Sequence, residues 1–254
     1  MIRVAFDLTA VAAGEVTIVG DEAHYLTRVR RVRVGEGLQL FDGVGRTAAA
    51  TIIRLTATSV VVAAQAPVTA APALPHITAM IPLIKGDRFE YCIEKLIEVG
   101  VDAILVWQAE RAVVKLDGDR ASARVAKWRN AITAATRQAG RAHEATIDGV
   151  LPLHGPTGAL ARLPADALRL LLHPSGGTPL LHLHHNDNAD GHNDRTAPIV
   201  VLTGPEGGLG PAEIEALTDQ HFCPAELGPT ILRAETAPVI AVALLRANTR
   251  QSLA

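Results

Sequence analysis

The chain has 254 residues, of which 48% are hydrophobic, and a formal net charge of only −2 at pH 7. This composition is that of a globular protein with one large or two modest domains, and the charge excludes a uniformly basic surface, so a polyanion would need a local patch. Cys92 and Cys223 lie far apart in sequence without metal-like spacing, which indicates a reducing compartment without a disulfide framework. The sequence shows no signal-peptide core and no apolar run of membrane-spanning length. We therefore expect a soluble cytoplasmic protein.

Short apolar runs separated by turn signals occupy the first 66 residues and predict a small antiparallel β-barrel. The runs are 16–19, 38–41, 50–53 and 60–62. Arginine and valine alternate from 28 to 34 except at the pair Arg30-Arg31, which breaks strict register. The pattern predicts a strand with Arg28 and Arg30 on one face, either for RNA or as a charged, protected edge. The Pro- and Ala-rich stretch 66–75 marks a boundary, giving expected domains 1–70 and 71–254.

Strand and helix patterns alternate beyond that boundary. Strands are expected at 77–84, 103–107, 168–172 and 199–202, and an amphipathic helix at 122–140. Asp87 and Glu90 predict a capping box that opens another helix, and 239–245 belongs to a last one. The alternation predicts a mainly parallel sheet with helices on both faces, whose ligands bind at the carboxyl ends of strands.

A glycine-rich turn follows the buried strand 199–202 and leads to a helix that begins at Pro211. It lacks the third glycine of a dinucleotide-binding loop and the lysine of a phosphate-binding loop. Glu206 would repel a polyphosphate, so we expect a neutral or cationic ligand. The alternative is a plain turn between a strand and a helix.

A second unusual segment, 227–238, again places a Gly-Pro turn before a helix. Arg233 lies near the helix start, where the helix dipole disfavours a cation, so its position indicates another role. The alternative is an exposed salt bridge with Glu235.

These two segments together resemble the signature of the RsmE-type 16S rRNA (uracil-N3)-methyltransferases of the SPOUT superfamily. The matching residues are Gly204-Pro205-Glu206-Gly207-Gly208 and Leu227-Gly228-Pro229-x-Ile231-Leu232-Arg233-x-Glu235-Thr236-Ala237. Segments 24–43, 85–88, 98–101 and 138–141 are also similar to the family, so the resemblance covers nearly the whole chain. Ala234 and Thr230 depart from it, since relatives usually carry Thr and often Arg there.

The resemblance implies a SPOUT-type α/β fold with a knotted parallel sheet, a C-terminal trefoil knot and an N-terminal PUA-like β-barrel that binds RNA. It further implies a homodimer that methylates N3 of a uridine in the decoding region of 16S rRNA of the small ribosomal subunit. S-adenosylmethionine is the implied cofactor, with no metal, membrane or DNA partner. Another SPOUT enzyme acting on tRNA or ribose, or a non-enzymatic RNA-binding or assembly protein, is the alternative.

The implied site residues fall into three groups. Arg233 is expected to stabilise a uracil anion, and Glu235 to orient Arg233 or accept the proton. Cofactor contacts are expected from Leu172, His173, Thr203, Gly204, Pro205, Glu206, Gly207, Gly208, Leu227, Gly228, Pro229, Ile231 and Leu232. RNA contacts are expected from Arg28, Arg30, Arg31, Arg33, Lys85, Arg88, Arg137 and Arg141.

The polar segment 182–192 is rich in histidine and shows no helical or strand period. Imidazoles bind metals, but we expect a surface loop here.

Overall fold

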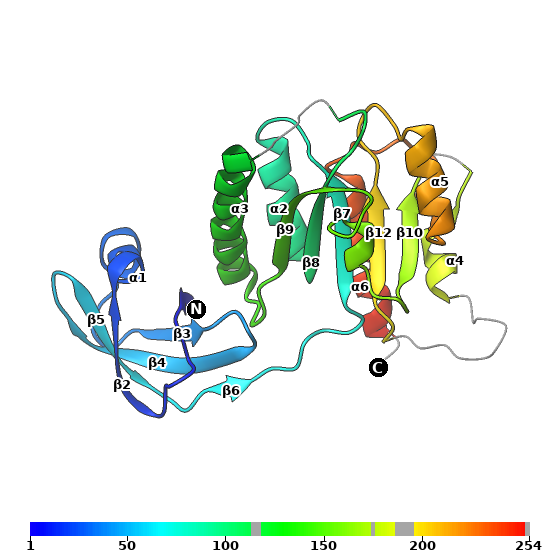
Figure 1. The fold of residues 1–254 in the computed structure, drawn as a ribbon. Helices are drawn as coiled ribbons and strands as arrows, with labels where there is room; N and C mark the ends of the chain where they lie inside the picture. The colour runs from blue at the N-terminus through cyan, green and yellow to red at the C-terminus, as the bar shows by residue number, and fades with distance from the viewer. Residues whose placement is uncertain (113–117, 174–175, 186–195, 252–254) are drawn as a thin grey trace. The chain divides into compact units, whose positions relative to one another are not determined.

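The computed structural model describes residues 1–112, 118–173, 176–185 and 196–251 and divides into two compact units (Figure 1). The first comprises Met1–Pro72 and Thr133–Glu144, and the second comprises Ala73–Ile132 and Ala145–Ala254. Helix α3 (Gly118–Ala139) therefore begins in the second unit and ends in the first. Among the described residues, no helix is long and apolar enough to cross a membrane.

The first unit is built on a mostly antiparallel sheet with the order β1-β3-β4-β5-β2, and β6 pairs with β4. Along β4, Ala48, Ala50 and Ile52 are buried in alternation, as a strand with one face on a core requires. The parallel pairing of β1 with β3 was not expected from the sequence. The strands are β1 (Ile2–Ala5), β2 (Gly14–Val19), β3 (Gly37–Phe41), β4 (Arg46–Leu55), β5 (Ser59–Ala64) and β6 (Val68–Thr69).

The strand predicted at 28–34 is wrong. The chain instead forms helix α1 (Gly20–His24), which continues directly into the π-helical turn η1 (Tyr25–Arg30). Ala23 and Leu26 are buried in the core of this unit. Residues three apart lie on the same face of a helix but on opposite faces of a strand, so a helix buries both side chains and a strand would not.

The end of α3 is fastened to the first unit by Arg3 of β1. Its guanidinium donates to the carbonyl oxygen of Thr136 in the last turn of α3, at 3.0 Å, and to that of Arg141 just beyond the helix, at 2.8 Å. Arg137, in the last turn, forms an ion pair with Glu22 and lies over the ring of Tyr25, 4.7 Å from its centroid. Burial raises the pKa of the Glu22 carboxyl, and the charge of Arg137 opposes this shift.

The second unit contains a seven-stranded parallel sheet, as predicted, with the order β11-β13-β10-β12-β7-β8-β9. Every residue of the central strands β7 and β12 is buried, which explains their continuous apolar runs. The strands are β7 (Ile77–Pro82), β8 (Ala103–Gln108), β9 (Thr146–Pro152), β10 (Leu168–Leu172), β11 (Thr178–Pro179), β12 (Ile199–Thr203) and β13 (Cys223–Glu226).

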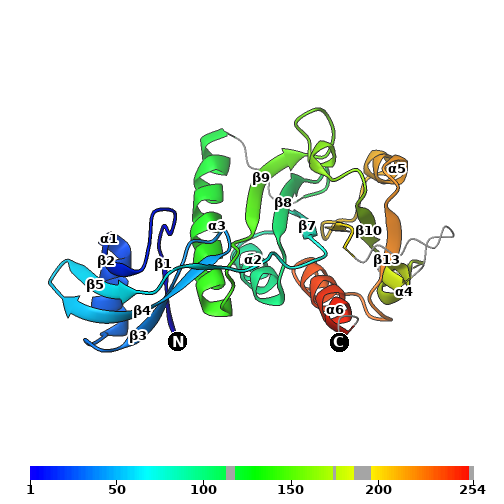
Figure 2. The same ribbon diagram turned by 90° about the horizontal axis from the view of Figure 1, so that it is seen from below.

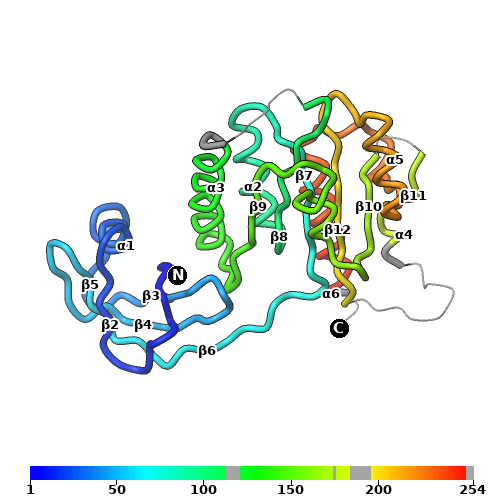
Figure 3. Tube along the Cα trace, in the orientation of Figure 1, coloured from blue at the N-terminus to red at the C-terminus, as the bar shows by residue number. Residues whose placement is uncertain are grey.

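Helices cover both faces of this sheet. Figure 2 shows α2 (Arg88–Val99) and α6 (Ala237–Gln251) on one side of the strands and α5 (Pro211–Asp219) on the other. After β13 at one side of the sheet, the chain returns to its middle, where α6 packs against β7, β12 and α2 (Figure 3). The turn η2 (Leu160–Arg162) and α4 (Leu180–His185) complete the unit.

Two local expectations need correction. The capping box predicted at Asp87 is wrong, because Asp87 has helical backbone angles and its side chain makes no capping hydrogen bond, while Glu90 instead pairs with Lys127 at 2.7 Å. The histidine-rich segment 182–192 is not wholly a loop, since its first residues belong to α4; residues 186–192 lie outside the described part of the chain.

Candidate active site

The carboxyl ends of three neighbouring parallel strands converge at one end of the sheet. Pairing between β10 and β12 places Leu172 beside Thr203, and pairing between β10 and β13 places Leu172 beside Ala225. The backbone N–H of His173 continues the ladder and donates to Ala225 at 2.9 Å. Loops that leave these strands therefore meet above a common row of side chains.

The glycine turn after β12 is held at both ends. The N–H of Gly208 donates to the carbonyl of Pro205 at 2.9 Å, and Gly208 has φ +72°, a left-handed conformation suited to glycine. Farther on, the carboxylate of Glu213 accepts from the N–H of Gly210 at 2.8 Å and from the N–H of Glu110 at 2.7 Å. Glu213 thus caps α5, which begins at Pro211 as predicted, and ties the turn to the loop after β8.

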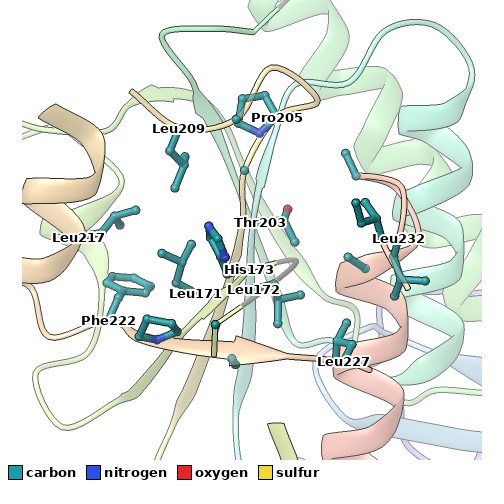
Figure 4. A pocket seen from close by; sticks show the side chains of 18 of the residues that line it. Leu171, Leu172, His173, Thr203, Pro205, Leu209, Leu217, Phe222, Leu227 and Leu232 are labelled. Carbon is teal, nitrogen blue, oxygen red and sulfur yellow. The ribbon is translucent and has the colours of Figure 1, made fainter. Parts of the chain in front are cut away.

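These loops and α5 border an open cavity of about 810 Å³ (Figure 4). Such a volume is sufficient for a small organic ligand or cofactor. Figure 4 shows Leu217 and Phe222 on the α5 side, Leu227 and Leu232 on the opposite side, and Leu171 between them. The cavity is therefore lined mainly by apolar side chains, and polar groups enter it at only a few points.

One of those polar groups is the hydroxyl of Thr203. The residue is 3% exposed and lines the cavity, and its Oγ1 finds no hydrogen-bond partner among the described residues. Buried hydroxyls in proteins are normally paired, because an unpaired one costs free energy. This orphaned group indicates that the cavity is shaped for a ligand with a complementary polar atom.

Charged groups gather at one side of the cavity. Glu206 and Arg233 line it, and Glu235, whose side chain is 9% exposed, lies just behind with its Oε1 3.8 Å from Nη1 of Arg233. Arg88 approaches both carboxylates, at 3.3 Å from Glu206 and 3.6 Å from Glu235. Behind them lies Cys92, where burial and the neighbouring Glu235 charge raise the pKa of the thiol to about 12.

Comparison with known proteins identifies the family of the chain. The family model for the RNA methyltransferase domain matches residues 72–246, and that for the RNA methyltransferase PUA domain matches residues 18–64. The ribosomal RNA small subunit methyltransferase E of Mycobacterium bovis is 34% identical over 233 residues, covering 90% of this chain and 85% of that protein. The chain belongs to the ribosomal RNA small subunit methyltransferase E family.

Two further members of the methyltransferase E family and one other solved methyltransferase agree with this assignment. The Bacillus subtilis protein is 28% identical, covering 92% of this chain and 90% of its own length. A Neisseria gonorrhoeae member solved with bound S-adenosyl methionine is 26% identical, with a TM-score of 0.82 and 98% coverage of each chain. A Legionella pneumophila protein solved with the cofactor SAM is also 26% identical, with a TM-score of 0.83 and 97% coverage of each. The predicted SPOUT-type sheet and PUA-like first domain are confirmed, and the trefoil knot stays a prediction.

The structure brings together most of the residues expected to bind the cofactor. Those that line the cavity are Leu172, His173, Thr203, Gly204, Pro205, Glu206, Gly208, Leu227, Gly228, Ile231 and Leu232. Gly207 and Pro229 are exposed and lie outside the lining. A Cβ at Gly207 would lie 3.2 Å from the Arg111 backbone oxygen, so this glycine permits a close approach between two loops.

Sequence reasoning missed the apolar half of the cavity. This half is lined by Leu171, Leu209, Ile214, Leu217, Phe222, Pro224 and Ala225. Of these residues, the sequence indicated only that Leu171 is buried, because it lies in the apolar run 168–172. Pro224 and Ala225 gave no signal, since β13 is a short strand without an apolar run.

The residues expected to contact RNA differ in their surroundings. Arg28, Arg30, Arg31 and Arg33 are exposed on η1 and the turn that follows it, and Lys85 is exposed before α2. By contrast, the Arg137 side chain is only 18% exposed and is paired with Glu22. The Arg88 guanidinium lies near the carboxylates of Glu206 and Glu235. Among the described residues, no group of three or more His, Cys, Asp or Glu is arranged to hold a metal ion.

Proposed function

We propose that this chain transfers a methyl group from S-adenosylmethionine to N3 of one uridine in the decoding region of 16S rRNA. The observation that carries the proposal is the cavity at the ends of β10, β12 and β13, which joins an apolar lining to Arg233 at its edge. Membership of the methyltransferase E family, whose Neisseria member was solved with the same cofactor, supports it.

The residues that line the cavity fit this cofactor. A sulfonium ligand is cationic, and the lining carries the carboxylate of Glu206. Among the described residues that line the cavity, the basic Lys or Arg side chain is Arg233 alone, which is 76% exposed, so the described lining offers no lysine to hold a polyphosphate. The orphaned hydroxyl of Thr203 offers a polar contact, while Leu217 and Phe222 offer apolar surface for a purine ring.

Once bound, S-adenosylmethionine supplies an electrophilic methyl group on a positively charged sulfur. The protein's part is to make uracil N3 nucleophilic, because this nitrogen carries a proton at neutral pH. The N3 proton passes to solvent water, and Arg233 can stabilise the uracil anion that remains, since its guanidinium offers permanent charge and several donors to the uracil oxygens. Its exposure lets it reach a base presented from solvent.

Glu235 holds Arg233 in our proposal. Its Oε1 lies 3.8 Å from the arginine, and its burial fixes the position of the carboxylate. Such a site needs few catalytic groups, because orientation of two reactants can itself supply roughly 7–11 kcal/mol of barrier reduction.

In this proposal the first unit binds the RNA. Arg28, Arg30, Arg31 and Arg33 present four exposed guanidiniums within six residues, and the backbone turns left-handed at Arg31 (φ 53°). With aromatic residues only 3% of the chain, phosphate contacts should outweigh base stacking, which makes binding strongly dependent on salt.

We also propose a homodimer. Tyr91 of α2 and Ile240 of α6 are exposed on two helices that pack together, and Ile231, in the segment that leads to α6, is 82% exposed. Apolar side chains exposed on neighbouring segments are typical of subunit interfaces.

A methyl-acceptor assay tests the proposal. The purified chain is incubated with methyl-labelled S-adenosylmethionine and, separately, small ribosomal subunits, naked 16S rRNA and tRNA. We expect label in small-subunit RNA. Label confined to tRNA would assign another substrate, and no label with any RNA, together with no cofactor binding at millimolar concentration, would leave a non-enzymatic RNA-binding protein.

A further inference from the structure

Helix α2 begins with an arginine that lies between two loops of the candidate active site. Nη1 of Arg88 is 3.3 Å from Oε1 of Glu206 and 3.6 Å from Oε1 of Glu235. Glu206 belongs to the glycine turn after β12, and Glu235 to the segment before α6. The two loops line different parts of the cavity. Because the Arg88 guanidinium contacts a carboxylate on each of them, it links the two loops.

The position of Arg88 is unfavourable for the helix alone. A cation in the first turn of a helix opposes the helix dipole, and Asp87 before it makes no side-chain capping bond that would offset this. The two carboxylates are what stabilise the charge there. The Arg88 side chain is 43% exposed, so more than half of it is covered by its surroundings.

Glu235 depends on Arg88 because its own surroundings are nearly closed. Its side chain is 9% exposed, its Oε1 lies between Arg88 and Arg233, and its Oε2 has no hydrogen-bond partner among the described residues. Of the two arginines, Arg233 is the more exposed, at 76%, and the farther from the carboxylate, at 3.8 Å. Arg88 is therefore the closer and less exposed of the two partners that hold the Glu235 carboxylate in place.

We propose that Arg88 is a positioning residue, not an RNA contact: it ties the glycine turn to the segment that carries Arg233. The inference rests on the proposed methyl transfer for its kinetic consequences. Without Arg88, Glu206 loses its partner and the turn that lines the cofactor cavity is less firmly held. The Glu235 carboxylate then keeps Arg233 as its remaining partner but is no longer fixed by Arg88, so it orients Arg233 less precisely toward the substrate.

The test compares Arg88→Ala and Arg88→Lys with a matched control, Arg162→Ala. Arg162 also forms an ion pair, at 2.5 Å from Asp148, and its side chain is 42% exposed, but it lies outside the candidate active site. Calorimetry gives the Kd for S-adenosylmethionine, steady-state assays give kcat and KM for RNA, and titrations at several salt concentrations give the slope of log K against log salt.

We expect Arg88→Ala to weaken cofactor binding about three- to tenfold, as fits the loss of two partly exposed ion pairs, and to lower kcat about tenfold. The salt slope should stay at the wild-type value, Arg88→Lys should recover part of both losses, and Arg162→Ala should match wild type. A slope reduced by about 0.7–0.9 with unchanged cofactor Kd would instead identify a phosphate contact and overturn the proposal. Wild-type values of Kd and kcat in Arg88→Ala would overturn it as well.

A double-mutant cycle on the ligand-free protein tests the link independently of the methyl transfer. Arg88→Ala and Glu206→Gln should change the melting temperature non-additively, because each removes the same ion pair. Additive shifts would refute the link. If wild type neither binds the cofactor nor methylates RNA while the shifts are non-additive, then the proposed function fails and the link between the two loops stands.

Discussion

Replacing Thr203 with valine should change stability and cofactor binding in opposite directions. The two side chains have nearly the same shape, and position 203 is 3% exposed at the end of a strand that accepts β-branched residues, so the main change is loss of the hydroxyl. In the ligand-free protein this hydroxyl is buried without a partner among the described residues. Removing it should stabilise the fold by about 1–3 kcal/mol, the usual cost of an unsatisfied buried polar group.

Cofactor binding should weaken in the same variant. If the hydroxyl pairs with the ligand, its loss forfeits about 0.5–1.5 kcal/mol, which corresponds to a Kd roughly two- to twelvefold higher. Thermal unfolding without ligand and calorimetric titration with S-adenosylmethionine measure the two effects. Each kilocalorie per mole should raise Tm by about 2–4 °C in a chain of this size.

Thr136→Val is the matched control for that experiment. Thr136 is fully buried in α3, its Oγ1 also lacks a partner among the described residues, and it lies outside the cavity. Valine and threonine have similar helix propensities, so this variant should gain stability and keep the wild-type Kd. The reasoning would be refuted if Thr203→Val bound the cofactor as well as wild type, or if both variants bound it equally weakly.

Three further predictions concern catalysis, RNA binding and pH. Arg233→Ala should lower kcat at least tenfold and leave the cofactor Kd within twofold, since Arg233 is assigned to the uracil; an equal loss in both would contradict that role. Replacing Arg28, Arg30 and Arg31 together with alanine should make the slope of log K against log salt shallower by about 2–3, whereas an unchanged slope would return them to a structural role. The pKa of Cys92 is raised from its ordinary value of 9.0 to about 12, so the unfolded chain loses this proton first as pH rises. Unfolding free energy should therefore fall between pH 9 and 12 in wild type and fall less in Cys92→Ala, and equal slopes would argue against this cause.

The repeated elements of the second unit could be predicted because each has a strong local pattern. The continuous run at β12 and the three- and four-residue spacing in α3 follow from burial on both faces of a strand and on one face of a helix. The parallel sheet followed from their alternation. β13 could not be predicted, since four residues with a proline are recruited to the sheet only by their neighbours β10 and β11.

Charged residues were the hardest to place from the sequence. The arginines from 28 to 33 were assigned to a strand, whereas Arg28 and Arg30 lie on η1 and Arg31 and Arg33 follow it. The buried side chains of Ala23 and Leu26 favour helical spacing up to Arg30. Arg88 looked like a surface cation because Glu206 and Glu235 lie more than a hundred residues away in sequence. The spacing of residues along the chain predicts contacts within a helix or a strand. It could not predict the ion pairs of this site, because they join loops that lie together only once the sheet has formed.

The most direct test of the central claim is the chemical identity of the methylated nucleoside. Small ribosomal subunits that lack the modification are incubated with the purified chain and S-adenosylmethionine, and their RNA is digested to nucleosides and analysed by chromatography with mass spectrometry. We predict 3-methyluridine at one position of 16S rRNA. Methylation on a ribose hydroxyl or on uracil C5, or no methylated uridine at all, would contradict the account.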